Sequence, residues 1–337
     1  MGEPAKKAGV VVPERFIPTP TTISPQARAF LSSPMPVGLG ALPELDDIAG
    51  WRAYIAEHEQ GLAAFAARQA ECFPADVVTH QLSSAALYEV TPKTFAPENE
   101  ECAILYVHGG GFIVGAGDAT VTSALPLASR ARTRTFCVDY RMPPDSPFPA
   151  GLNDVVEAYR FLLDRYEPDR IGIYGASAGG SLGPAAVLAA RDAGLPLPAA
   201  CALHSPASDA TESGDTYETN AEIDFALRRR APQLYSLYAG GHDLKDPLIS
   251  PVFGDFTKGF PPTILTSGTR DLLLSSTVLL HRALRRAGVD AELHVWEAMP
   301  HVLFFGAPEE DEVYAEQVAF LLRYISKPEQ HSHISQY

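Results

Sequence analysis

The sequence predicts an α/β protein with a mainly parallel central sheet and a helical cover. After Pro74 the apolar positions alternate with polar ones or form short runs, as is typical of strands. The later runs alternate with patterns of helical period, at about 149–165, 177–193 and 274–287. Strands that alternate with helices of this length need crossover connections, and such connections make neighbouring strands parallel.

The N-terminal segment, residues 1–74, predicts an arm and cap helices. Residues 10–44 are rich in proline and predict an extended arm with one short helix, for which Ser24 and Pro25 supply the cap and first-turn signals. From Asp46 onward, side chains at alternating spacings of three and four predict one face of a long amphipathic helix. These side chains are Ile48, Trp51, Ile55, His58, Leu62 and Phe65. We expect this face to pack on the main domain.

Eight runs predict the strands of the core. They lie at 76–82, 85–90, 102–108, 134–140, 170–175, 199–205, 262–268 and 291–297. The first two or three have short connections, which favour an antiparallel edge. Residues 207–247 are too long for a plain connection and turn from polar to helical and basic near residue 225, so we expect a cap insertion there. The core is then divided into 75–206 and 248–326, and 327–337 form a C-terminal tail.

The composition is that of an ordinary globular protein and argues against several partners. The 337 residues carry a formal net charge of -15, whose field repels nucleic acid and anionic membrane surfaces. The first apolar stretch is too short for a secretory leader, so the expected location is the cytoplasm. The uncharged stretch 171–190 has the length of a membrane span, but its five glycines and one proline favour a buried strand, turn and helix.

The cysteine and glycine patterns indicate neither a metal nor a cofactor. The cysteines stand at positions 72, 102, 137 and 201, without the close spacing of metal or redox motifs, and we expect them to be reduced core residues. The sequence contains no metal-ligand set and no nucleotide fingerprint, so we expect no metal and no cofactor.

A nucleophile candidate stands between a predicted strand and a predicted helix. Gly175, Ser177 and Gly179 form a G-x-S-x-G pattern, in which the serine sits on a sharp turn and larger neighbours would clash with the backbone. The alternative is a glycine-rich turn that binds a phosphate or nothing. The pattern G-x-x-x-x-G-K-[S/T] is absent from the sequence here, which disfavours phosphate binding.

A serine nucleophile needs a base and an acid downstream, because its hydroxyl is a poor nucleophile until its proton is removed. Asp271 follows the strand at 262–268, and His301 follows the last strand, both at the sheet edge where ligands collect. Other histidines are rivals, and Asp290 precedes the last strand at its opposite end. These histidines are His204, His242, His281 and His294. The order serine, acid, histidine favours Asp271 and His301.

The strand at 102–108 ends in a histidine that is followed by three consecutive glycines. A run of glycines costs conformational entropy on folding, so it needs a structural or chemical reason. The residues are His108, Gly109, Gly110 and Gly111. Taken alone, they are consistent with a tight turn or with a backbone that approaches a ligand closely.

Four segments together resemble the hormone-sensitive-lipase-like esterases, bacterial family IV of the α/β-hydrolase superfamily. They are HGGGF at 108–112, GASAG at 175–179, Asp271 in GTRDLLLSS and His301 in MPH. The resemblance implies the α/β-hydrolase fold with a helical cap and covers roughly residues 75–325.

Two further segments support the resemblance, and one residue departs from it. DYRMPPDSPFPAGLNDV from Asp139 and SPASD from Ser205 match family segments in order. The family usually has a glutamate after DYR, where this chain has Asp145. The departure concerns the hydrogen bonds around residue 145 and not the residues expected to react.

The resemblance implies acyl transfer by a catalytic triad. Ser177 would attack an ester carbonyl, His301 would move the proton, and Asp271 would orient and stabilise the imidazole. The expected substrates are small esters of short or medium acyl chains, with lactones included. Two alternatives stay open, namely a non-catalytic small-molecule-binding protein on the same scaffold and an amidase or peptidase. Relatives often pair through the sheet edge near the last strand, which suggests a homodimer.

The resemblance also assigns an oxyanion hole. Its donors would be the backbone amides of Gly110, Gly111 and Ala178, and His108 would hold the glycine loop from behind. We expect Gly110→Val to lower catalysis far more than stability.

Overall fold

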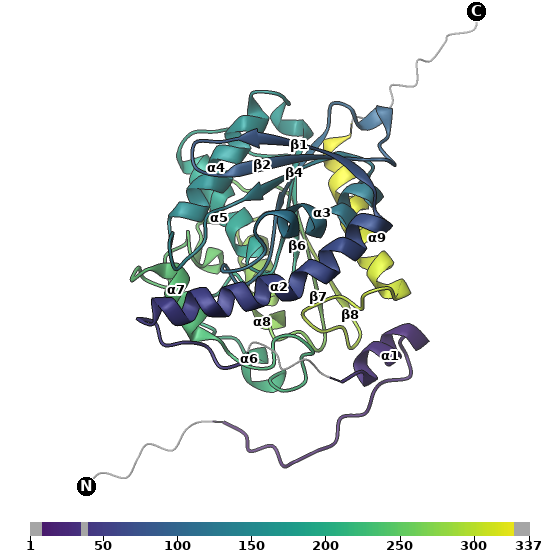
Figure 1. Cartoon of the computed structure of the whole chain (residues 1–337), viewed down its shortest axis with the longest axis vertical. Coiled ribbons are helices and arrows are strands. Elements are labelled where there is room, and N and C mark those ends of the chain that lie inside the picture. The colour runs from purple at the N-terminus through teal and green to yellow at the C-terminus, as the bar shows by residue number, and fades with distance from the viewer. Residues whose placement is uncertain (1–8, 35–39, 327–337) are drawn as a thin grey trace, which may run out of the picture.

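The computed structural model describes residues 9–34 and 40–326, which form one eight-stranded sheet with helices on both faces (Figure 1). The predicted tail, 327–337, lies outside the described residues. The strand order is β1-β2-β4-β3-β5-β6-β7-β8. The strands are β1 (Ala75–Gln81), β2 (Ala86–Pro92), β3 (Ala103–Val107), β4 (Arg134–Asp139), β5 (Ile171–Ala176), β6 (Ala200–His204), β7 (Thr263–Gly268) and β8 (Ala291–Trp296).

The pairing confirms the predicted mixture of parallel and antiparallel strands. β1 pairs with β2, and β2 with β4, in the antiparallel sense, whereas all other neighbours pair in parallel. All eight predicted strands are present. The parallel strands therefore deliver their carboxyl ends, and the loops that follow them, to one edge of the sheet.

Helices cover the sheet on both faces. One core cluster joins the sheet to α4, α5 and α8, and a second joins it to α3 and α9. The helices are α1 (Pro25–Ser32), α2 (Ile48–Cys72), α3 (Asp118–Ala131), α4 (Ala150–Leu163), α5 (Gly179–Asp192), α6 (Thr216–Thr219), α7 (Pro232–Ala239), α8 (Leu274–Arg286) and α9 (Pro308–Ile325). Short 3-10 helices lie at Pro97–Asn99, Pro168–Arg170, Pro251–Phe253 and Phe256–Lys258.

The long predicted N-terminal helix is α2, which begins after an Asp47 cap and crosses the front of the molecule (Figure 1). Trp51 anchors it in a small apolar cluster with Ile113 and residues of α7. On its outer side Arg52 forms an ion pair with Asp145, 2.6 Å apart. The aspartate that departs from the family pattern thus ties the loop after β4 to α2.

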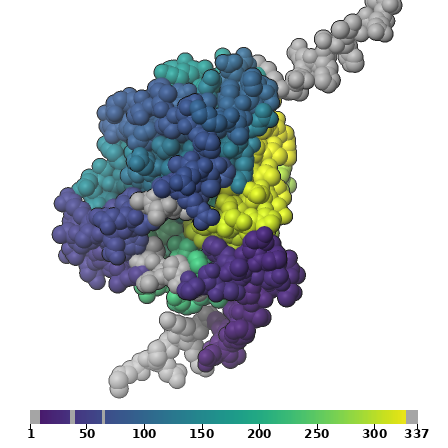
Figure 2. Space-filling view, turned by 45° about the vertical axis from the view of Figure 1, so that its right-hand side comes forward, coloured from purple at the N-terminus to yellow at the C-terminus, as the bar shows by residue number. Residues whose placement is uncertain are grey.

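The segment around α1 lies against the C-terminal part of the chain, which is yellow in Figure 2. The Ser24 hydroxyl caps α1 by accepting from the Ala27 amide and donates to Glu309 of α9 at 2.7 Å. Arg270 donates to the Pro18 carbonyl at 2.8 Å. These bonds fix the arm beside the loop that carries Asp271.

The insertion 207–247 contributes α6 and α7, but its helical content is smaller than the sequence predicted. Helical structure was expected from about residue 225, and α7 begins only at Pro232. A proline disfavours helical geometry in the residue before it, which places the helix start at the proline. The Asp224 side chain also accepts from the amides of Ala226 and Leu227, which holds that stretch in a turn.

One cysteine differs from expectation. All four are free, and Cys102, Cys137 and Cys201 are buried as predicted. Cys72 is exposed, because it ends α2 on the solvent side. The uncharged stretch at 171–190 forms β5, a turn and the buried helix α5, as predicted. Within the described part of the chain, no helix is long and apolar enough to cross a membrane.

Candidate active site

Ser177 lies on a sharp turn between β5 and α5. Its φ of 53° is in the left-handed region, which is costly for a residue with a side chain and is found at functional turns. A Cβ atom on Gly175 would stand 2.3 Å from the Gly179 carbonyl oxygen, and one on Gly179 would stand 1.9 Å from that of Val107. Only glycine fits at either position, so the two glycines let the turn present Ser177 at the end of the strand.

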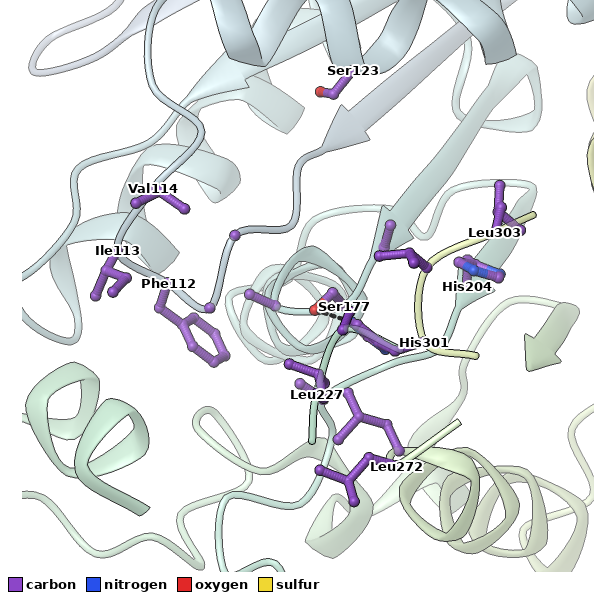
Figure 3. Close-up of a pocket in the computed structure, with 18 of the residues that line it drawn as sticks. Phe112, Ile113, Val114, Ser123, Ser177, His204, Leu227, Leu272, His301 and Leu303 are labelled. Atoms are coloured by element: carbon purple, nitrogen blue, oxygen red, sulfur yellow. Dashed lines mark hydrogen bonds between the residues drawn. The ribbon is translucent and has the colours of Figure 1, made fainter. Parts of the chain in front are cut away.

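The three residues predicted to react lie together at the carboxyl edge of the sheet. The Ser177 Oγ is 2.8 Å from His301 Nε2 (Figure 3), and His301 Nδ1 is 3.2 Å from Asp271 Oδ1. With the proton of the neutral imidazole on Nδ1, the serine hydroxyl donates to Nε2 and Nδ1 donates to the carboxylate. This arrangement can remove the serine proton as the oxygen attacks.

The Asp271 carboxylate is fully buried and well provided with donors. Oδ2 accepts from the hydroxyls of Ser205 and Ser267, and Oδ1 accepts from the Leu273 amide at 2.9 Å. Burial alone would raise the pKa of Asp271, but the bond to His301 and the serine hydroxyls outweigh it and hold that pKa below its ordinary value. Asp271 therefore stays ionised beside the imidazole. Ser205 belongs to the SPASD segment, so this segment supplies a hydrogen bond to Asp271.

His301 is buried, and its pKa responds to the charges around it. Burial alone would lower the pKa of the imidazole, but the hydrogen bond and charge of Asp271 and the charge of Asp224 raise it above the ordinary 6.5. A base with a raised pKa accepts a proton more readily, and it is neutral and able to act only above that pKa.

Asp224, in the insertion, is a buried carboxyl that sequence reasoning missed. Its Oδ2 accepts from the Leu272 amide at 2.7 Å and from the His301 amide at 3.2 Å. It therefore connects the insertion to the two loops that carry Asp271 and His301. Burial and the nearby charge of Asp271 raise its pKa to about 6. Nothing in the spacing of NAEIDFALRRR distinguishes this aspartate, because its partners are backbone amides far away in sequence.

The glycine loop places two amides near Ser177. Gly110, Gly111 and Ala178 line the same cavity as Ser177 and His301. Within residues 9–34 and 40–326, none of their three amides donates to a protein acceptor. The Glu59 carboxylate of α2 accepts from the Gly115 amide at 2.7 Å and so supports the far end of the loop.

The structure corrects the expectation about Gly110→Val. The φ of Gly110 is 110°, and a Cβ there would stand 2.0 Å from the Val114 carbonyl oxygen. Any side chain at this position therefore disturbs the fold. Gly111, with φ of 60°, has only a Leu234 methyl at 3.4 Å from such a Cβ, which makes it the better position for a test.

His108 lies behind the glycine loop and does not line the cavity. Its Nδ1 donates to the Gly109 carbonyl at 2.7 Å, and its ring stacks on Tyr140 at 4.1 Å. The Tyr140 hydroxyl donates to the His108 carbonyl at 3.0 Å. Burial lowers the pKa of His108 to about 4, so the ring is neutral at ordinary pH. These contacts are those of a residue that holds the loop.

The cavity above Ser177 has a volume of about 620 Å³. Its walls come from the glycine loop, α2, α3, the insertion, the loop after β8 and α9. Among the aromatic residues of the cover, Tyr217 lines the cavity. Others pack elsewhere, namely Phe30, Trp51, Phe225 and Tyr238. The α2 side chains Tyr54, His58 and Leu62 face the cavity, although a packing face was expected for the last two.

The rival histidines have other surroundings. His294 lies within β8 and pairs with Glu316 and Glu292, and His281 lies on α8, 3.2 Å from the Ala291 carbonyl oxygen. His242 packs edge-on against Phe148. His204 ends β6 and lines the cavity, so it is the one rival among these that shares the site.

Comparisons with known proteins agree with this geometry. The α/β-hydrolase fold family model matches residues 104–305. An acetyl-hydrolase of Streptomyces hygroscopicus is 38% identical over 205 residues, which cover 59% of this chain and 67% of that protein. An ethyl acetate hydrolase of Pseudomonas putida is 30% identical, with 59% of this chain and 65% of that protein covered. The matched region thus spans about two thirds of these relatives.

Solved structures extend the likeness to most of the chain. The crystal structure of an esterase named E25 has a TM-score of 0.88 and 36% identity, and the match covers 94% of this chain and 99% of that one. A hormone-sensitive lipase from a metagenome library has a TM-score of 0.77 and 31% identity, with 89% of this chain and 98% of that one covered. The chain therefore belongs to the hormone-sensitive-lipase-like esterases of the α/β-hydrolase family, and it is a carboxylic ester hydrolase.

Proposed function

We propose that the protein hydrolyses short and medium acyl esters through a Ser177-His301-Asp271 triad and an acyl-enzyme intermediate. The observation that carries the proposal is the hydrogen-bonded series of these three side chains, of which Ser177 and His301 line one cavity. The pKa directions agree with the roles, since Asp271 is held ionised and His301 is made a stronger base.

In the first half of the reaction, Ser177 Oγ forms a bond to the ester carbonyl carbon while its proton passes to His301 Nε2. The tetrahedral intermediate then collapses, the bond to the alcohol oxygen breaks, and His301 gives that oxygen the proton. In the second half, His301 takes a proton from water, the water oxygen attacks the acyl carbon, and Ser177 leaves with the proton. The products are an alcohol and a carboxylic acid.

The negative oxygen of each tetrahedral intermediate needs donors that are already in place. We assign this role to the amides of Gly110, Gly111 and Ala178, because all three line the cavity and none donates to another protein acceptor within the described ranges. His108 would hold the loop through its bond to Gly109. A lost donor of this kind costs about a hundredfold to a thousandfold in kcat in other hydrolases.

Cavity size and the relatives support small substrates. A volume of about 620 Å³ suits a small or medium ester better than a long-chain lipid. The relatives named above are called an acetyl-hydrolase and an ethyl acetate hydrolase. Lactones are cyclic esters, so the same attack would open them, and they belong in the substrate panel.

The test is hydrolysis of p-nitrophenyl esters from acetate to dodecanoate, together with a series of lactones. We expect kcat/KM to be highest for short or medium chains and Ser177→Ala to be inactive with an unchanged melting temperature. Full activity in Ser177→Ala would contradict the proposal. The rates of hydrolysis of p-nitrophenyl butyrate and of the matched amide, the p-nitroanilide of butyric acid, distinguish an esterase from an amidase. A wild-type protein that binds esters without hydrolysing any of them would favour the non-catalytic alternative.

A further inference from the structure

One side of the cavity extends past His301 toward the space between the sheet, α3 and α9. In Figure 3 Ser123 lies above Ser177, and His204 and Leu303 lie to its right, whereas Phe112 lies to its left and Leu227 below it. We call this part the α9 arm. It is lined by Tyr106, Ser123, Tyr174, His204, Leu303, Glu310 and Tyr314. The arm combines an apolar surface with several polar groups, and a buried ring nitrogen among them has no hydrogen-bond partner.

The His204 ring is held in one orientation from behind. It is 6% exposed at the end of β6, and its Nδ1 lies 2.9 Å from the Thr266 hydroxyl of β7. That hydroxyl accepts in turn from the Gln317 amide of α9 at 2.7 Å. The backbone carbonyl of His204 accepts from the Ser177 amide at 2.9 Å, so the residue is also fixed relative to the nucleophile. The position of its Nε2 is therefore set before any substrate enters.

Three other polar side chains of the α9 arm already have partners. The Tyr106 hydroxyl donates to the Ser123 carbonyl, and the Ser123 hydroxyl donates to the Thr120 carbonyl, both at 2.9 Å. Glu310 accepts from the Gly306 amide at 2.6 Å. His204 Nε2 is buried and has no hydrogen-bond partner of ordinary geometry in the described ranges, and the backbone of His301 lies close to the ring.

A buried polar atom without a partner is costly, so it points to a ligand when it lines a cavity. His108 Nε2 is also buried and unpaired, but His108 lies outside the cavity and cannot meet a substrate. His204 Nε2 can. Of these two histidines, His204 is therefore the one placed to recognise a substrate.

We propose that His204 is a specificity-determining residue that hydrogen-bonds a hydroxyl group on the alcohol portion of the substrate. The preferred substrates would be monoesters of diols rather than esters of simple alcohols. The inference rests on the ester hydrolysis proposed above and names the substrate class for the same site.

Two arguments select this chemistry. Burial lowers the pKa of His204 to about 4, so the ring is neutral and Nε2 either donates or accepts, depending on the tautomer. A hydroxyl is able to pair with either form, whereas an ether oxygen or an ammonium group pairs with only one. The leaving alcohol must also lie against His301, which gives it a proton, and the α9 arm opens beside the loop of His301.

The experiment compares matched esters of the same acid. Ethyl, propyl and butyl butyrate are each paired with the butyrate monoester of the diol of the same length, and kcat/KM is measured for both members. We expect the wild-type protein to favour at least one diol monoester by about tenfold or more, because a simple ester leaves Nε2 desolvated and unpaired. In His204→Leu this ratio should fall to about one.

Controls separate recognition from folding. His281→Leu, on α8 and outside the cavity, should keep the wild-type ratio. Melting temperatures check the folding of each variant, and the wild-type ratio remains a test by itself if His204→Leu does not fold. The ratio of kcat/KM for ethyl 4-hydroxybutyrate to that for ethyl butyrate tests whether a hydroxyl on the acyl side is recognised. We expect this ratio to be about one.

The outcomes are distinct. A wild-type ratio near one, an unchanged ratio in His204→Leu, or a preference found only on the acyl side would each overturn the assignment of His204. In these cases hydrolysis of the simple esters leaves the proposed function intact. Absence of all ester hydrolysis would contradict the proposed function and, with it, the role of His204.

Discussion

Replacing Asp224 with asparagine tests how the insertion holds the acid and the base in place. The carboxylate accepts from four backbone amides, two in its own segment and two in the loops of Asp271 and His301. An amide side chain has a single acceptor oxygen. In either orientation of the new side chain, two of the four amides then lose their acceptor.

The change in stability follows from two opposing terms. Leaving a buried donor unpaired costs about 1–3 kcal/mol, so the loss of two acceptors costs about 2–6 kcal/mol. Removing the charge offsets part of this cost, because the variant no longer buries an ionised carboxylate. The rise of the Asp224 pKa from 3.8 to about 6 corresponds to about 3 kcal/mol for that burial at neutral pH. We expect a net loss of stability of no more than about 3 kcal/mol.

The pH dependence of that loss has a definite sign. A carboxyl whose folded-state pKa is raised contributes stability that is complete below the unfolded pKa of 3.8 and disappears as the pH rises through about 6. Asp224→Asn lacks this contribution. The stability deficit of the variant should therefore shrink between about pH 4 and pH 6 and stay constant above, as measured by denaturant unfolding.

Activity should fall together with stability. When the new amide nitrogen stands in the place of Oδ2, the loops of Asp271 and His301 lose their common acceptor, and we expect kcat to fall about tenfold to a hundredfold with little change in KM. The negative charge of Asp224 also raises the pKa of His301. Its removal should shift the acid limb of the kcat/KM profile to lower pH, an effect that a purely structural role would not produce.

Asp209→Asn is the matched control. Asp209 is also buried, but its side chain bonds only to Thr211 and Ser213 within the insertion. This variant should lose stability and keep the wild-type acid limb. An Asp224→Asn enzyme with the wild-type kcat and acid limb would refute the reasoning.

Two further predictions concern the glycine loop and the cysteines. Gly110→Ala should lower the melting temperature, because its Cβ would stand 2.0 Å from the Val114 carbonyl oxygen. Gly111→Ala should lower kcat with a smaller loss of stability. Equal melting temperatures in the two variants would contradict this contrast. Cys72 should react with a thiol reagent in the native protein, and Cys102 only after unfolding; rapid native labelling of Cys102 would show that its burial is wrong.

Much of the fold was predictable because its determinants are local. The apolar runs gave all eight strands, and the Ser24 cap gave the start of α1. The helix α3 was not predicted, since Pro126 and its threonines weaken the helical pattern and packing on the sheet overrides propensity. The helix α9 was not predicted either, although it carries a proline at its start and three acidic residues in its first turn.

The site was predictable only where chemistry imposes a local pattern. The turn at Ser177 and the strand-end positions of Asp271 and His301 follow from the order of elements along the chain. Asp224 acts on backbone amides that are distant in sequence, and the unpaired Nε2 of His204 becomes visible only once the cavity is formed. The spacing of residues along the sequence predicts neither arrangement.

The central claim is that Ser177 is the nucleophile activated by His301. The most direct measurement is reaction with a fluorophosphonate, which forms a covalent adduct with an activated serine, followed by peptide mass spectrometry. We predict one adduct, on Ser177, formed in parallel with the loss of ester hydrolysis and much more slowly in His301→Ala. An adduct on another residue, or full hydrolytic activity after complete labelling of Ser177, would contradict the account.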